Sequence, residues 1–184
     1  MKRLFVAVPV SDEVKQKIQE LVEKLKETGA DLKLVSLFNL HFTLKFLGDV
    51  GESKIPEIEE RLAGIAAKTR GFEVTVKGTG VFPSFDRINV VWIGSEGAEL
   101  VSLMKVVGKE LNFVKKNDYE EEVAHLTIAR VKSGRNKKEL QEFVQKFAQK
   151  EFGRMIVNKI ILFESELRKD GAVHRVVKEF VLGN

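Results

Sequence analysis

Apolar and polar positions along this chain show two periodicities, one typical of strands and one typical of helices, and the two alternate along the sequence. A first strand is predicted over residues 3–9, where β-branched and aromatic residues cluster. Ser11 then offers a helix N-cap, and apolar residues recur at helical spacing until Thr28-Gly29. Further strands are predicted over residues 41–47, 72–82, 87–93, 123–131, 154–163 and 173–181, and helices over residues 53–68, 96–111 and 136–150.

The second half of the chain repeats features of the first half in the same order. The matched pieces are residues 3–8 and 87–92, then His41 and His125, then residues 81–84 and 162–165. Each of the first two segments stands at the same distance before its histidine. Several echoes in one order indicate an internal duplication, which in this case has only two copies.

The duplication predicts an α+β fold with two lobes related by a pseudo-twofold axis. Each lobe is expected to hold an antiparallel sheet flanked by helices, with a central active-site cleft between the lobes. No Gly/Ser-rich or Pro-rich linker separates the halves, so we expect residues 1–184 to form a single bilobal catalytic domain. Its internal repeats would cover about residues 1–83 and 84–184.

Composition narrows the class of protein. Hydrophobic residues make up 43% of the 184 residues, with 13 Phe, which suffices for a core and excludes a disordered chain. The absence of Cys excludes disulfides, a thiol nucleophile and Cys-based metal sites. Charged residues reach 32%, as on thermophile surfaces, and the net charge of +4 permits a phosphate-bearing partner. The N-terminal apolar stretch lacks a signal-peptide cleavage site and no run could span a membrane, so we expect a cytoplasmic protein.

The chemistry lies in two tetrapeptides at matching points of the repeats, His41-Phe42-Thr43-Leu44 and His125-Leu126-Thr127-Ile128. Side chains alternate along a strand, so His41 and Thr43 share one face, and His125 and Thr127 do likewise. The apolar residues between them would face the core. Two imidazoles and two hydroxyls are therefore expected to converge on one small volume.

Paired imidazoles suit phosphodiester cleavage by general acid–base catalysis. One neutral His takes a proton from the attacking oxygen, while a protonated His gives one to the departing oxygen. A pKa near 6.5 lets both forms coexist around neutral pH. Thr hydroxyls can donate hydrogen bonds to the non-bridging phosphate oxygens as charge builds in the transition state. The sequence has no metal-binding motif, and the acidic stretch 118–122 is predicted to be a solvated turn, so we expect no metal and no cofactor.

The whole chain resembles the two-histidine phosphoesterases, specifically the LigT-like RNA 2′,3′-cyclic phosphodiesterases, also named 2′-5′ RNA ligases. The resemblance is carried by residues 3–9, 41–48, 82–92, 125–130 and 162–165. It implies hydrolysis of an RNA 2′,3′-cyclic phosphate end, of tRNA fragments for example, to a 2′-phosphomonoester. It also implies a reverse reaction that joins RNA ends through a 2′-5′ linkage.

The resemblance further implies roles for individual residues. His41 would be the proton donor to the leaving 3′ oxygen and His125 the proton acceptor that activates water. Thr43, Thr127 and Arg130 would hold the phosphate. From the residues alone, the pseudo-symmetry leaves open which histidine is the acid.

Some positions carry competing interpretations. Strict alternation places Arg130 on the face opposite His125, so the strand must bulge near Ala129 or Arg130 must reach round its end. Lys45 shares the predicted face of His41 and is either a phosphate ligand or a solvated lysine. Trp92 is predicted to lie in the core. His174 is expected to be structural or to line the rim, at a position where relatives often carry Tyr.

Two other functions compete with this interpretation. The chain could act on a small nucleotide cyclic phosphate or a 2′,5′-oligoadenylate, or it could bind RNA ends without catalysis. The presence of both proton carriers and both hydroxyls favours an enzyme. A basic run between Arg130 and Lys138 either holds an RNA strand or is a solvated loop. We expect a monomer.

Overall fold

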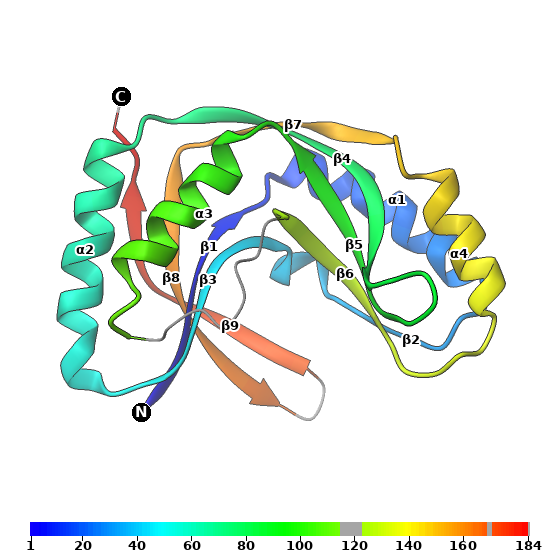
Figure 1. Ribbon diagram of the computed structural model, residues 1–184, viewed down its shortest axis with the longest axis horizontal. Helices are drawn as coiled ribbons and strands as arrows, with labels where there is room; N and C mark the ends of the chain where they lie inside the picture. The colour runs from blue at the N-terminus through cyan, green and yellow to red at the C-terminus, as the bar shows by residue number, and fades with distance from the viewer. Residues whose placement is uncertain (115–122, 169–170, 184) are drawn as a thin grey trace.

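The computed structural model describes residues 1–114, 123–168 and 171–183 and shows a mixed fold of strands and helices (Figure 1). Its strands are β1 (Lys2–Pro9), β2 (Leu32–Leu34), β3 (His41–Val50), β4 (Phe72–Pro83), β5 (Ile88–Glu96), β6 (His125–Val131), β7 (Glu151–Val157), β8 (Lys159–Arg168) and β9 (Gly171–Val181). Its helices are α1 (Asp12–Glu27), α2 (Ile55–Lys68), α3 (Glu99–Glu110) and α4 (Lys137–Lys146), with short 3₁₀ helices η1 (Leu37–Asn39) and η2 (Glu52–Lys54). The acidic stretch 118–122 lies outside the described residues.

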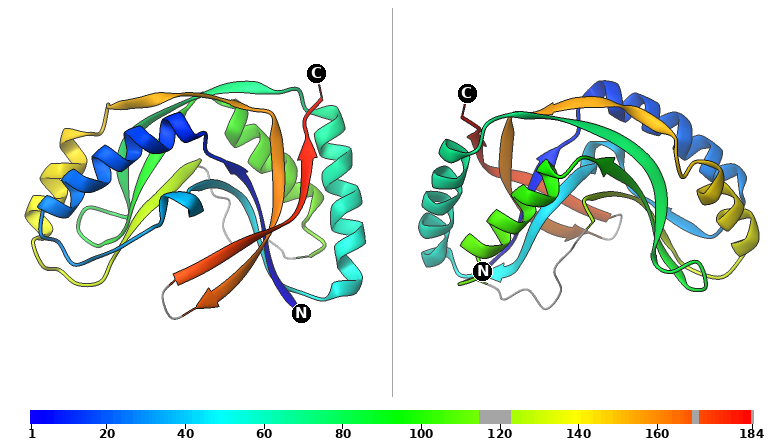
Figure 2. Two further views of the ribbon diagram at one scale, coloured as in Figure 1. Left: turned by 180° about the vertical axis from the view of Figure 1, so that it is seen from behind. Right: turned by 45° about the horizontal axis from the view of Figure 1, so that its top comes forward.

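The strands form two antiparallel sheets, as the sequence predicts. Sheet A has the order β3-β1-β8-β9, and sheet B has the order β2-β6-β5-β4-β7. Helices α2 and α3 pack on strands of sheet A, whereas α1 and α4 pack on strands of sheet B. Figure 2 shows the two helix pairs at opposite ends of the molecule. Within the described residues, no helix combines the length and apolarity that a membrane span requires.

Each sheet contains strands from both halves of the sequence. Strands β2 and β4 come from the first half but belong to sheet B, and β8 and β9 come from the second half but belong to sheet A. The two sheets therefore do not coincide with the two sequence repeats. A twofold axis that relates the halves stays a prediction.

Helix α1 shows how local sequence specifies these elements. The Ser11 hydroxyl accepts a hydrogen bond from the Val14 amide at 3.5 Å, as expected of an N-cap. The apolar positions at helical spacing are all buried, and they are Val14, Ile18, Leu21, Val22 and Leu25. Thr28 caps the C-terminal end, and Gly29 follows in the left-handed conformation at φ 65°. Both predicted ends of this helix are confirmed.

Some predicted elements are wrong. The single strand predicted over 154–163 is two strands, and the chain passes from sheet B to sheet A at Asn158. Apolar residues 155–157 and 160–163 flank the polar pair Asn158-Lys159, so periodicity alone could not detect the crossing. The three-residue strand β2 was not predicted, and α4 ends at Lys146 rather than Lys150.

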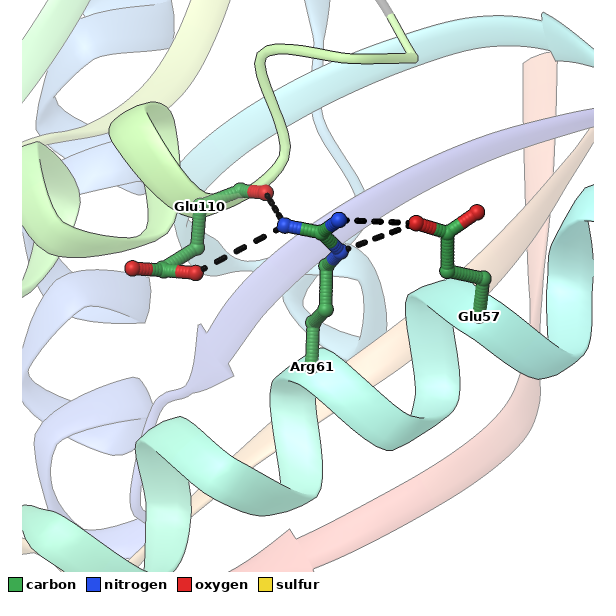
Figure 3. A network of polar contacts seen from close by, with 3 residues as sticks. All are labelled: Glu57, Arg61 and Glu110. Carbon is green, nitrogen blue, oxygen red and sulfur yellow. Dashed lines mark hydrogen bonds and ion pairs between the residues drawn. The ribbon is translucent and has the colours of Figure 1, made fainter.

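A polar network on the surface joins α2 to the end of α3 (Figure 3). The Arg61 guanidinium donates to Glu57 Oε1 from Nε at 3.1 Å and from Nη2 at 2.8 Å. Its Nη1 donates to the Glu110 carbonyl oxygen at 3.3 Å and lies 3.8 Å from Glu110 Oε2. The guanidinium carbon also lies 4.4 Å from the centroid of the Phe113 ring. Exposed pairs of this kind contribute about 1 kcal/mol or less, so the network adds little to the stability of the fold.

Candidate active site

His41 is the first residue of β3 and its imidazole is fixed by the backbone just before it. The Nδ1 atom lies 2.6 Å from the carbonyl oxygen of Asn39. A carbonyl only accepts, so Nδ1 carries the hydrogen and Nε2 is left to face a substrate. Asn39 lies at the end of η1, where its side-chain amide donates to the carbonyl oxygen of Ala172 at 2.8 Å. The loop that orients His41 is thereby tied to β9.

His125 repeats this arrangement at the start of β6. Its Nδ1 atom lies 2.9 Å from the carbonyl oxygen of Val123, which again stands two residues before the histidine. The same tautomer follows, with the hydrogen on Nδ1 and the lone pair on Nε2. Both imidazoles therefore use the same nitrogen for anchoring and leave the same nitrogen for chemistry.

The structure brings the two motifs together. Strands β3 and β6 contact each other although they belong to different sheets, and they lie beside each other in the middle of the molecule (Figure 1). A positive charge on His125 lies close enough to His41 to disfavour its protonation. The convergence that the duplicated tetrapeptides predict is therefore present for the histidines.

The environment of His41 favours its neutral form. Burial lowers the pKa of His41 from 6.5 to about 4, because an imidazolium there loses its hydration. The hydrogen bond to Asn39 raises this pKa, and the positive charges of His174 and His125 lower it. In the free protein, the His41 ring is therefore neutral at pH 7.

Both threonines stand two residues after their histidine and are half-buried. Directly opposite residues in an antiparallel pair share a face, so Thr43 lies on the face of Ala7 and Thr127 on the face of Trp92. Neither hydroxyl has a hydrogen-bond partner among the residues that the structure describes. They remain available to donate to an oxyanion.

A β-bulge follows each threonine at the same place. In β3, Thr43 and Lys45 pair with the neighbouring residues Ala7 and Val6, so Leu44 has no partner opposite. In β6, the positions that pair with Trp92 and Val91 are Thr127 and Ala129, so Ile128 is the extra residue. An extra residue reverses the alternation of side chains beyond it.

The bulge decides the positions of both predicted basic ligands. Beyond Ile128, Ala129 is buried and Arg130 is exposed on the face of Thr127, as the bulge alternative predicts. Beyond Leu44, Lys45 turns to the opposite face, where its Nζ donates to the Gly108 carbonyl oxygen of α3 at 3.2 Å. Lys45 is only 4% exposed, so both interpretations of it, a phosphate ligand on the face of His41 and a solvated lysine, are wrong. Phe46 occupies the place that corresponds to Arg130.

Aromatic rings support each histidine from its own sheet. The Phe5 ring, 2% exposed, lies 4.8 Å from the His41 ring and stacks at 5.1 Å on Phe163. The Phe82 ring meets His125 edge-on at 4.8 Å. Phe82 and Phe163 belong to the echoed segments of the sequence and pair with β5 and β1, respectively. These apolar contacts restrict the imidazole rotamers and exclude water from one side of each ring.

His174 and Trp92 both belong to this site. His174 meets His41 edge-on at 5.3 Å, and its buried Nδ1 has no hydrogen-bond partner among the described residues. Burial lowers the pKa of His174 as well. The Trp92 ring lies 6.3 Å from His125 and is half-buried on the side of Thr127, so its predicted place in the core is wrong.

The fold and the site can be compared with known proteins. The family model described as LigT-like phosphoesterase matches residues 8–92 and again residues 93–174. The chain belongs to this family. RNA 2′,3′-cyclic phosphodiesterase of Methanocaldococcus jannaschii is 35% identical over 97% of this chain and 99% of its own. The protein of the same name from Aquifex aeolicus is 40% identical over 90% and 92%. A crystal structure from Thermus thermophilus superposes with a TM-score of 0.80 at 25% identity, over 99% of both chains.

Some residues of this LigT-like site escaped the sequence analysis. The anchoring carbonyls of Asn39 and Val123 have no signature, because every residue has a carbonyl. Phe5 lies in the first echoed segment, but nothing in the sequence shows that its ring supports His41. Arg130, by contrast, was predicted, because residues 125–130 match the family motif.

Proposed function

We propose that this chain hydrolyses RNA 2′,3′-cyclic phosphate ends to 2′-phosphomonoesters by two-histidine acid–base catalysis. One observation carries the proposal: two imidazoles from different sheets approach each other, each with Nδ1 anchored and Nε2 free. The names of the two curated relatives, both RNA 2′,3′-cyclic phosphodiesterases, support the same reaction. RNA is accordingly the expected substrate class, and tRNA fragments are the expected form.

The roles of the histidines follow the family pattern. His125 Nε2 takes a proton from water as the water oxygen forms a bond to phosphorus. The bond between phosphorus and the 3′ oxygen breaks, and His41 Nε2 gives its proton to that oxygen. The product carries a phosphate on the 2′ oxygen and a 3′ hydroxyl. Each cycle leaves His125 protonated and His41 neutral, and proton exchange with solvent restores the starting forms.

His41 must gain a proton before it can act as the donor. Its low pKa disfavours this in the free protein, but an anionic phosphate close to Nε2 opposes the effects of burial and of the neighbouring histidines. Substrate binding and protonation of His41 are therefore coupled. Thr43 and Thr127 are proposed to donate to the non-bridging oxygens, and Arg130 to provide a positive charge beside them.

The same groups serve the reverse reaction by microscopic reversibility. A 5′ hydroxyl in place of water would attack the cyclic phosphate and form a 2′-5′ linkage. Water is in large excess, so hydrolysis should dominate unless base pairing holds two RNA ends together. We therefore expect ligation to be a minor activity of this enzyme compared with hydrolysis.

The test is turnover of an RNA oligonucleotide ending in a 2′,3′-cyclic phosphate, measured with EDTA present. We expect the wild type to form a 2′-phosphate, and H41A and H125A to lose at least a hundredfold in rate. K105Q, a change on the exposed side of α3, is the control and should retain wild-type turnover.

Other outcomes point to other functions. Turnover only of mononucleotide cyclic phosphates or of 2′,5′-oligoadenylates would replace RNA as the substrate. Tight binding of the RNA end without turnover would indicate a binding module. Activity abolished by EDTA and restored by a divalent ion would contradict the metal-free mechanism.

Three features of this proposal still rest on the sequence. They are a single catalytic domain with repeats of about residues 1–83 and 84–184, a monomeric state and a cytoplasmic location. The double match of the family model to residues 8–92 and 93–174 supports the duplication.

A further inference from the structure

Two cations face each other at the edge of sheet B. Strand β2 pairs with β6 so that Lys33 stands directly opposite Arg130. Directly opposite residues of an antiparallel pair project to the same face, with Cβ atoms about 5 Å apart. Leu32 and Leu34, on either side of Lys33, pack against the core instead. Lys33 therefore shares the face of Arg130, which the bulge at Ile128 places with His125 and Thr127.

This pair has no anion of its own. Like charges directly opposite each other destabilise a sheet. Both side chains are exposed, and no carboxylate among the described residues forms an ion pair with either of them. The folded protein thus places two like charges opposite each other, and a bound anion would offset their repulsion.

Three other cations of the basic run have partners within the protein. Arg135 Nε donates to the Gly29 carbonyl oxygen at 3.1 Å, and Lys137 Nζ donates to the Asp86 carbonyl oxygen at 2.5 Å. Lys138 lies 3.9 Å from Glu142 on α4. These contacts fasten the loop between β6 and α4. Within the described part of the run, Arg130 and Lys132 lack such a partner, and Lys132 lies just beyond the end of β6.

We propose that Lys33 binds the phosphodiester that links the terminal nucleotide of the substrate to the nucleotide before it, with Arg130 between this phosphodiester and the cyclic phosphate. At about 3.3 Å per residue, the five residues from His125 to Arg130 span about 16 Å along β6, a distance that the long side chains of Arg130 and Lys33 shorten when they extend toward His125. An RNA strand whose cyclic end lies between the histidines can follow the exposed face of β6 and reach this pair. The inference rests on the proposed function and deepens it, because a mononucleotide has no second phosphate. Lys33 would thus give the site a preference for RNA chains.

The experiment compares three substrates: a ribonucleoside 2′,3′-cyclic phosphate, a dinucleotide ending in the cyclic phosphate, and the same dinucleotide with a neutral methylphosphonate linkage. In wild type, kcat/KM should be about tenfold higher for the charged dinucleotide than for the neutral one. K33Q should abolish most of this difference through KM, and K33R should retain it. K105Q is the matched control and should behave as wild type.

Two further readouts separate this subsite from a general effect. For longer RNA, log(kcat/KM) should fall with log salt, and K33Q should make this negative slope shallower by about 0.7. Without RNA at low salt, K33Q should raise the unfolding temperature, because the repulsion with Arg130 is gone. If K33Q changed all three substrates by the same factor, or changed none, the subsite would be disproved.

Failure of the proposed function would be seen separately. If wild type turned over none of the substrates, the subsite would be tested by binding alone. Fluorescence anisotropy would then measure the dissociation constant of an RNA ending in a 2′-phosphate. Binding weakened about tenfold in K33Q but not in K105Q would uphold the subsite without catalysis. Equal binding by wild type and K33Q would disprove it.

Discussion

The carbonyl oxygen of Asn39 lies 2.6 Å from Nδ1 of His41, two residues later in the chain. This short contact determines which nitrogen of His41 meets the substrate. His125 has the same relation to Val123 at 2.9 Å. Each catalytic ring is therefore oriented by its own chain, without a carboxylate partner among the described residues. The orientation of each imidazole therefore depends on the position of the backbone segment that carries its anchoring carbonyl.

The side chain of Asn39 should contribute to both stability and catalysis. Its amide donor to Ala172 is the bond that ties η1 to β9. N39A should destabilise the protein by about 1 kcal/mol and lower kcat several-fold, because the carbonyl that orients His41 becomes mobile. N39D also lacks the amide donor and should be no better. Urea unfolding and steady-state kinetics would measure both effects, with exposed N89A as the control; an unchanged kcat in N39A would contradict the role.

Folding stability should depend on pH through His41. Its folded-state pKa of about 4 lies below the ordinary value of 6.5, so the unfolded state binds more protons between these pH values. The contribution of His41 is fully present above pH 6.5 and is lost as the pH falls towards 4. Across this window the loss amounts to about 3 kcal/mol. H41Q should remove this part of the pH dependence, measured by urea unfolding from pH 7.5 to 4.5; parallel curves for H41Q and wild type would contradict it.

His174 should help to keep the pKa of His41 low. Its ring covers His41 edge-on at 5.3 Å, and its positive charge opposes protonation of His41. H174A admits water and removes that charge, so the pKa of His41 should rise from about 4 towards 6.5. The proton resonances of His41 followed by NMR over pH 3–8 would report this directly. V181A, an exposed change on the same strand, should leave the titration as in wild type, and an unmoved midpoint in H174A would exclude the effect.

Gly80 should be required for the position of Trp92. A Cβ atom on Gly80 would lie 2.2 Å from the Trp92 ring, which packs on Phe82 and lies beside His125. G80A must displace the ring, so we expect a loss of about 1–3 kcal/mol in stability, a changed fluorescence of the one Trp, and lower activity. The matched control is G64A on α2, where an added Cβ meets nothing within 4 Å. G64A should instead stabilise the protein by about 0.5–1 kcal/mol. Unaltered fluorescence in G80A would show that Trp92 is held by other contacts.

Local patterns made much of the fold predictable. Helix α1 follows from the Ser11 cap, its apolar stripe and the Gly29 stop, which act within one or two turns. The pairing of each histidine with a threonine on one face follows in the same way, because strand alternation over two residues needs no partner strand. The chain crossing at Asn158 was missed because apolar residues 155–157 and 160–163 flank the pair Asn158-Lys159. Strand β2 was missed because three residues carry too little periodicity.

The bulges mark where local reasoning ends. Alternation placed Lys45 with His41 and left Arg130 in conflict with His125, and one extra residue in each strand reverses both positions. A bulge is a property of two paired strands, so a single strand's sequence does not show it. Lys33 opposite Arg130 is likewise a fact of pairing between segments about a hundred residues apart.

By itself, the sequence determined the elements, the two histidine–threonine faces and the chemistry that those residues support. Only the tertiary structure decided that the strands of His41 and His125 belong to different sheets, that the buried His41 ring is neutral, and that Arg130 rather than Lys45 accompanies the histidines. The physical reason is that burial, charge proximity and strand register arise between distant segments. Propensity and periodicity describe each segment alone, so they cannot predict burial, charge proximity or strand register between distant segments.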